Sequence, residues 1–216
     1  AVRAVRFCHT NRLLALPIGA RTSALGAFEA EVFARREGLS GMLGLQMEDL
    51  NRASSSGKIQ DCLLKLPDYQ RDEFDLILDN SGAMAVLVSK NFPKIPHRVI
   101  AHAGSHIREV NQFLNEHLRH EKYHFRVMPD PTSQGEAQVG GVVAAGAEGG
   151  NRSNAAEDLV SLIVISANGE EVFLTGQEAK DLVGMNGCAG MIFQAEFEVS
   201  AFPRHEHGIF IPIRGS

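Results

Sequence analysis

Small residues and hydroxyl groups gather between Met128 and Gly150, in the run MPDPTSQGEAQVGGVVAAGAEGG. This run lacks side chains large enough to build a core, so any chemistry must come from its backbone. Glycine lets a chain approach a ligand closely, and successive N–H groups in such turns form concavities that bind anions. The run therefore favours a phosphate or pyrophosphate site. A Gly/Ala-rich surface loop is the alternative.

Two further segments place small residues at the ends of predicted strands. The segment 17–23 (PIGARTS) follows a strand expected at 13–16, and the hydroxyls of Thr22 and Ser23 add donors for a phosphate. The segment 184–190 (GMNGCAG) precedes a strand expected at 191–199. Together with the 128–150 run, they predict three glycine-rich loops at strand ends.

Other reactive side chains give weaker patterns. His205, Glu206 and His207 alternate without a third partner, which is more typical of a solvated tail than of a metal site. Cys188 is either a reactive thiol or a small buried residue, and the second interpretation is favoured. His106 follows a strand end and is expected at the start of a helix. No Ser/His/Asp or Cys/His set can be assembled, so catalytic residues remain unassigned.

The elements that must position these loops are a mixture of helices and strands, which indicates an α+β architecture. Asn168-Gly169 predicts a tight hairpin. Ser105 is suited to cap a helix, and the alternation at 191–199 predicts a half-buried strand. Residues 53–97 have no firm period and are interpreted as an insertion or connector. The expected helices are 2–11, 28–36, 105–118 and 177–182, and the expected strands are 13–16, 42–47, 98–101, 160–166, 172–174 and 191–199.

Bulk composition describes an ordinary globular chain. It has 216 residues, 44% of them hydrophobic and 22% charged, with a formal net charge of −5. This charge provides no basic field for nucleic acid, and no apolar run approaches the ~18 residues of a membrane span. Three widely spaced cysteines without a C-x-x-C motif argue against a disulfide framework or a metal cluster. A cytoplasmic location is expected.

Five segments resemble, in order and approximate spacing, the FAD-binding domain of the vanillyl-alcohol-oxidase-like, or PCMH-type, flavoproteins. The closest branch is that of the FAD-linked oxidases related to glycolate oxidase and D-lactate dehydrogenase. The resemblance covers nearly the whole chain except residues 53–97. The segments are PIGARTSALGA (17–27), AHAGSHIREVNQFL (101–114), PDPTSQGEAQVGGVVAAGAEGG (129–150), DLVSLIVISANGEEV (158–172) and GMNGCAGMIFQAEFEV (184–199).

The resemblance implies an α+β fold of two subdomains, 1–98 and 99–202, with FAD held between them. Arg21-Thr22 stands where covalent members of the family have a histidine, so noncovalent FAD is expected. Residues 203–216 are then a tail that leads to a missing substrate domain. The implied cofactor contacts are Gly19, Ala20, Arg21, Thr22 and Ser23 in the first loop, Pro131, Thr132, Ser133, Gly140, Gly141 and Ala144 in the second, and Gly190 and Ile192 in the late loop.

The function implied is the flavin domain of an FAD-linked oxidoreductase that oxidises a small 2-hydroxy acid. Substrate contacts would come from the missing C-terminal domain and electrons would pass to a partner, so this chain alone is not expected to turn over. The alternative is a non-catalytic domain of the same fold that binds another nucleotide or serves in assembly. That alternative is favoured by the insertion, by Glu148 near the presumed pyrophosphate, and by Gly184-Met185-Asn186-Gly187-Cys188 in place of the family's G-S-E-G-T.

Overall fold

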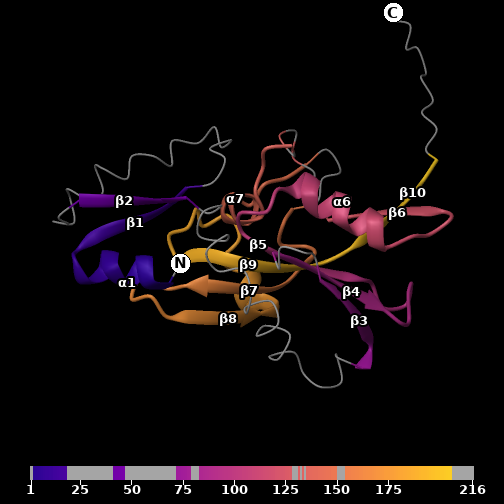
Figure 1. Cartoon of the computed structure of the whole chain (residues 1–216), viewed down its shortest axis with the longest axis horizontal. Coiled ribbons are helices and arrows are strands. Elements are labelled where there is room, and N and C mark those ends of the chain that lie inside the picture. Colours follow the sequence, from indigo (N-terminus) through magenta and orange to yellow (C-terminus); the bar gives the residue numbers. More distant parts are fainter. Residues whose placement is uncertain are drawn as a thin grey trace, which may run out of the picture.

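The computed structural model describes residues 2–18, 41–46, 72–78, 83–127, 131, 133, 135–149 and 154–205. A six-stranded antiparallel sheet occupies the centre of this part of the chain, with a two-stranded sheet toward each end (Figure 1). The helices are α1 (Val2–Thr10), α6 (Ile107–His117), α7 (Val139–Ala145) and α8 (Gly176–Lys180). The strands are β1 (Leu13–Ile18), β2 (Gly41–Gln46), β3 (Phe74–Leu78), β4 (Met84–Ser89), β5 (Arg98–His102), β6 (Tyr123–Arg126), β7 (Leu159–Ile165), β8 (Glu171–Thr175), β9 (Met191–Glu198) and β10 (Ser200–Pro203).

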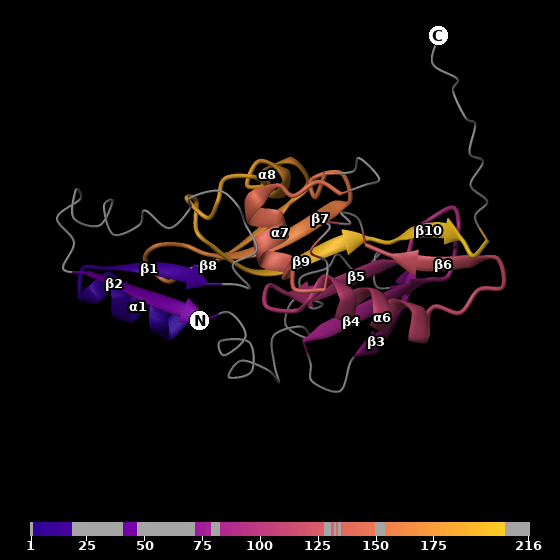
Figure 2. The ribbon, with the colours of Figure 1, turned by 90° about the horizontal axis from the view of Figure 1, so that it is seen from above.

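Helices α6, α7 and α8 pack on the central sheet, whose strand order is β3-β4-β5-β9-β7-β8 (Figure 2). The spacing of Ile107, Val110 and Leu114 predicts one apolar face on α6. This is confirmed, because all three are fully buried in the core that the helices share with the sheet. The predicted cap of α6 is wrong by one residue. His106 occupies the N-cap position, and its backbone N–H donates to the Glu109 carboxylate at 3.1 Å.

β9 is more deeply buried than the sequence predicts. The alternation at 191–199 predicted a half-buried strand, yet Gln194 and Glu196 are only 4% and 3% exposed. β9 lies between β5 and β7 and pairs antiparallel with both. A strand with a neighbour on each side and cover on both faces buries its polar residues together with its apolar ones, so each buried polar side chain needs a partner.

Glu196 finds its partners on the two neighbouring strands. Ser161 Oγ on β7 donates to its carboxylate at 2.6 Å, and Arg98 Nη1 on β5 lies 3.4 Å from it. The Arg98 guanidinium also stacks over the Phe74 ring, 5.2 Å from its centre. A buried carboxylate is tolerated when it is paired and hydrogen-bonded in this way. The cluster links strands β3, β5, β7 and β9 on the same sheet.

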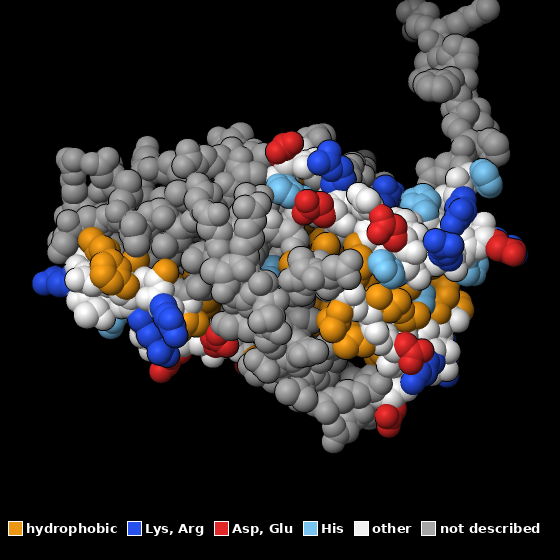
Figure 3. Space-filling model, in the orientation of Figure 1, with side chains coloured by type: hydrophobic (Ala, Val, Ile, Leu, Met, Phe, Trp, Pro, Cys, Tyr) orange, Lys and Arg blue, Asp and Glu red, His pale blue; other side chains and the backbone are white. Residues whose placement is uncertain are grey.

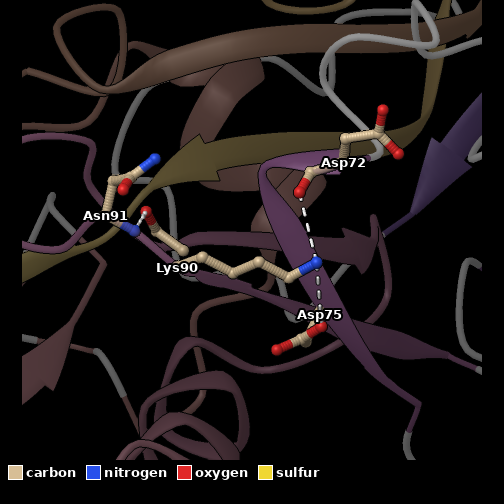
Figure 4. A network of polar contacts seen from close by, with 5 residues as sticks. Asp72, Asp75, Lys90 and Asn91 are labelled. Carbon is tan, nitrogen blue, oxygen red and sulfur yellow. Dashed lines mark hydrogen bonds and ion pairs between the residues drawn. The ribbon is translucent and has the colours of Figure 1, made fainter.

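Residues 53–97 are not simply an insertion. β3 and β4 fall within this range and form one edge of the central sheet, where β4 pairs antiparallel with β5. The predicted boundary between 98 and 99 would therefore cut a continuous sheet. At the outer edge, Lys90 Nζ donates to the Asp72 carbonyl at 3.1 Å and pairs with Asp75 at 3.4 Å (Figure 4). This exposed network holds the end of β4 beside β3.

The N-terminal elements form a small α/β unit. β1 and β2 confirm the strands expected at 13–16 and 42–47, and they pair in parallel. α1 contacts the central sheet at the β7–β8 hairpin, because Arg6 Nε donates to the Gly169 carbonyl at 3.2 Å. The hairpin itself forms as predicted at Asn168-Gly169, with Gly169 at a φ of +78°. The arrangement of two subdomains around FAD remains a prediction, and the helix expected at 28–36 lies outside the described residues.

Asp158→Asn is expected to stabilise the protein near pH 7. Burial, followed by the nearby carboxylates of Glu198 and Glu157, raises the pKa of Asp158 to about 6, although Lys180 opposes this. The folded state therefore binds the proton more tightly than the unfolded state, and the free energy of unfolding falls as pH rises through this pKa. Allowing for solvent screening, the variant should gain about 1–2 kcal/mol at pH 7.5 and almost nothing at pH 4.

Urea denaturation at the two pH values measures this difference. Glu178→Gln, which removes an exposed carboxylate on α8, is the matched control and should change neither value. A stabilisation by Asp158→Asn that is equally large at pH 4 and pH 7.5 would contradict the assignment.

Candidate functional site

Segments far apart in the sequence meet where β5 ends and β9 begins. We call this side of the central sheet, which is formed by strand ends, the sheet edge. The Ala103 N–H donates to the Phe193 carbonyl at 2.9 Å and joins these two strand ends. α7 begins at the same edge, because the Gly140 N–H donates to the Ala103 carbonyl at 2.8 Å and the Val139 N–H to the Ser105 carbonyl at 2.9 Å. The structure therefore places the predicted glycine pair directly against the turn at 103–105.

Gly140 is a close-packing position. A Cβ placed on it would lie 2.6 Å from the Ala103 Cβ and 3.2 Å from the Ala103 carbonyl oxygen. Its N–H is already bonded within the protein, so this donor is not available to a phosphate. Ala144 lies one turn further along the same face of α7 and packs against the core. Glycine at 140 is what allows α7 to approach the sheet edge this closely.

Gly141 points in a different direction. No atom of the described residues lies within 4 Å of a Cβ placed there, and the residue is exposed. Its N–H, in the first turn of α7, has no hydrogen-bond partner among the described residues. Neither glycine of the pair has positive φ, which excludes a left-handed turn as the reason for glycine at these positions. Gly141 is therefore the one of the pair that leaves room for a ligand.

The second loop enters this edge through Pro131 and Ser133. Pro131 is buried, and the Ser133 carbonyl accepts the N–H groups of Glu136 and Ala137 at 2.9 and 2.8 Å. These two bonds form a turn that delivers the chain to the start of α7. Thr132 lies outside the described residues, as do Gly19, Ala20, Arg21, Thr22 and Ser23 of the first loop.

The late loop is tied to the other end of α7. The Gly184 N–H donates to the Val143 carbonyl at 3.1 Å, and the Asn186 N–H to the Ala144 carbonyl at 2.7 Å. Gly190 closes the loop at a φ of +144°, where a Cβ would lie 2.6 Å from Val164 Cγ1. Ile192 follows at the buried start of β9. The structure thus joins the late loop to the C-terminal end of α7 through Gly184 and Asn186, while the turn at Ser133 leads into its N-terminal end.

Glu148 follows the C-terminal end of α7. It comes two residues after the left-handed C-cap Gly146 and forms an isolated bridge with Asn154. Gly141 lies in the first turn of the same helix. That Glu148 brings a negative charge near the pyrophosphate stays a prediction.

Two buried amide oxygens near this edge lack partners among the described residues. They are Oε1 of Gln138, which is the N-cap of α7 and 6% exposed, and Oε1 of Gln194, which is 4% exposed on β9. Buried polar atoms without partners are rare and are often completed by a ligand or water. The sequence interpretation missed both glutamines, although Gln138 lies only two residues before Gly140. Gln194 pairs with His102 and lies on the face of the sheet opposite Ala101 and Ala195, so only Gln138 lies on the same element as Gly141.

Charged and sulfur-containing side chains contribute little here. On the face shown in Figure 3, Lys and Arg side chains are interspersed with Asp and Glu side chains. Within the described residues, no three His, Cys, Asp or Glu side chains gather as a metal site would require, and no helix is long and apolar enough to cross a membrane. Cys188 is exposed, contrary to the interpretation as a buried residue.

Comparison with known proteins supports the fold. No protein-family model and no curated sequence matches the chain. Two crystal forms of alkyldihydroxyacetonephosphate synthase match with TM-scores of 0.57 and 0.56 at 16% identity, over 94% of this chain. The chain spans 30% of the length of those structures. At this identity the likeness shows a shared fold. It does not support the glycolate oxidase and D-lactate dehydrogenase branch.

Proposed function

We propose that this chain is a flavin-binding domain that holds FAD noncovalently and belongs to an FAD-linked oxidoreductase. The observation that carries the proposal is that the second and late loops join the two ends of α7, with Gly140 packed against Ala103 and Gly141 open. The fold shared with alkyldihydroxyacetonephosphate synthase supports it. In this proposal the cofactor lies along the outward face of the α7 N-terminus.

The residues at this edge would bind and orient the cofactor mainly through backbone groups. Among the described residues, the Gly141 N–H is the donor in the first turn of α7 that has no backbone partner, and a backbone donor for a pyrophosphate avoids the cost of burying a lysine or arginine. Gln138 would add an amide contact. FAD itself supplies hydride and electron transfer when it is bound. The protein would contribute its position.

The substrate class is a further part of the proposal. The sequence resemblance suggests a small 2-hydroxy acid, with electrons passing to a separate acceptor. Because the chain spans 30% of the length of the solved structures that it matches, residues outside it would supply substrate contacts and acid–base groups. No described residue is assigned a catalytic role.

Purified protein is expected to be yellow and to release all its flavin on acid precipitation. The reason is that Arg21-Thr22 offers no histidine for a covalent bond in the first loop. The absorbance spectrum of the supernatant and of the redissolved pellet measures the release. Flavin retained in the pellet would overturn the noncovalent assignment. Colourless protein that takes up ATP or ADP but no FAD would favour the non-catalytic alternative.

A further inference from the structure

Two asparagines of α6 hold the backbone of β6 and of the residue that follows it. Asn115 bonds both backbone groups of Phe125, donating to its carbonyl at 2.7 Å and accepting from its N–H at 2.9 Å. One turn earlier, Asn111 Oδ1 accepts the N–H of Val127 at 2.9 Å. The side chains of α6 thus take the place of a neighbouring strand, and β10 pairs with β6 separately.

The same helix also holds the far end of the second loop. The Ile107 N–H donates to the Ala137 carbonyl at 2.9 Å. Ile107 and Asn111 are four residues apart, so they lie about one turn from each other on the same face of α6. Val127 and Ala137, which flank the segment that carries Pro131 and Ser133, are therefore both fixed to a single turn of one helix.

We propose that Asn111 is a positioning residue for the cofactor: by holding Val127 it sets where the segment with Pro131 and Ser133 leaves β6. This inference rests on the proposed function. β6 keeps its pairing with β10 and its two bonds to Asn115 without Asn111, so the fold does not depend on this bond. What depends on it is the position of Val127, the last described residue before the segment that carries Pro131 and Ser133.

Asn111→Leu tests the proposal, since leucine keeps the shape and removes the acceptor. Asn111→Asp retains a carboxylate oxygen that can accept the Val127 N–H and is the rescue variant. Gln112→Ala is the matched control, because Gln112 bonds only the exposed Glu116 among the described residues. Loss of one hydrogen bond should weaken FAD binding about tenfold in Asn111→Leu. Binding by the other two variants should match the parent chain.

Two measurements distinguish a failure of this inference from a failure of the proposed function. Hydrogen exchange of the Val127 amide should be about tenfold faster in Asn111→Leu, with or without FAD, because its acceptor is gone. Flavin fluorescence then gives the Kd for FAD. If the parent chain binds no FAD, the proposed function fails. If the parent binds FAD and Asn111→Leu binds it equally well, the positioning role is overturned. Unfolding of Asn111→Leu, or failure of Asn111→Asp to restore affinity, would also overturn it.

Discussion

Gly141→Val is expected to abolish FAD uptake while leaving the fold of the apo protein intact. No atom of the part of the chain that the structure describes lies within 4 Å of a Cβ at this position, so the valine side chain meets none of the described residues in the apo protein. In the proposed complex that space belongs to the cofactor, and two methyl groups there would displace it. Valine costs a helix slightly less than glycine does, so the free energy of unfolding should not fall, and a gain of up to about 0.5 kcal/mol is expected.

The neighbouring glycine provides the matched comparison for this experiment. Gly140→Val places its side chain against Ala103, where even a Cβ would come within 2.6 Å. Forcing atoms into such a contact costs about 1–3 kcal/mol of stability. Far-UV circular dichroism, urea denaturation and FAD titration of both variants separate a blocked ligand from a damaged fold. FAD affinity that survives Gly141→Val would show that the cofactor lies elsewhere.

Glu196→Ala is expected to destabilise the protein by about 3–5 kcal/mol, because it leaves a buried guanidinium without its carboxylate. Glu196 is 3% exposed, and its carboxylate bonds Ser161 and pairs with Arg98. Replacing both charged partners together, in Arg98→Met/Glu196→Leu, removes the uncompensated charge and should recover most of the loss. Urea denaturation of Arg98→Met, Glu196→Leu, the double variant and the parent completes the cycle, and Glu196→Ala is measured beside them.

A small loss of stability in Glu196→Ala would contradict this expectation. A loss below about 1 kcal/mol would mean that water reaches the cluster and screens its charges, as in exposed ion pairs. Glu178→Gln again serves as the control for removing a carboxylate from an exposed position.

Local elements were predictable because their signals are local. The apolar residues at helical spacing in α6 and the Asn168-Gly169 turn depend only on neighbours within a few residues. The order of strands depends on distant residues. β9 lies between β5 and β7 through contacts with residues far away in the sequence, and nothing in its alternation distinguishes a central strand from a half-buried one. For the same reason the sequence alone indicates an insertion or connector where β3 and β4 lie.

The sequence does not distinguish the two glycines of the candidate site. Gly140 and Gly141 are identical neighbours in a glycine-rich run, and the resemblance predicts that both contact a pyrophosphate. Consecutive helical residues point about 100° apart, so one glycine faces Ala103 and the other faces out. Once 139–145 is known to be helical, the difference follows. The run itself, with few helix formers besides alanine, gave no reason to predict a helix there.

Direct titration of the purified chain tests the central claim. FAD and FMN are each titrated against apo protein, with quenching of flavin fluorescence as the signal. FMN lacks the pyrophosphate bridge and the adenosine, so it cannot use a backbone donor at Gly141 in the same way. The account predicts saturable binding of one FAD per chain and binding of FMN that is weaker by at least about tenfold, the difference of one charge-assisted hydrogen bond. Absence of saturable FAD binding, or equal affinity for FAD and FMN, would contradict it.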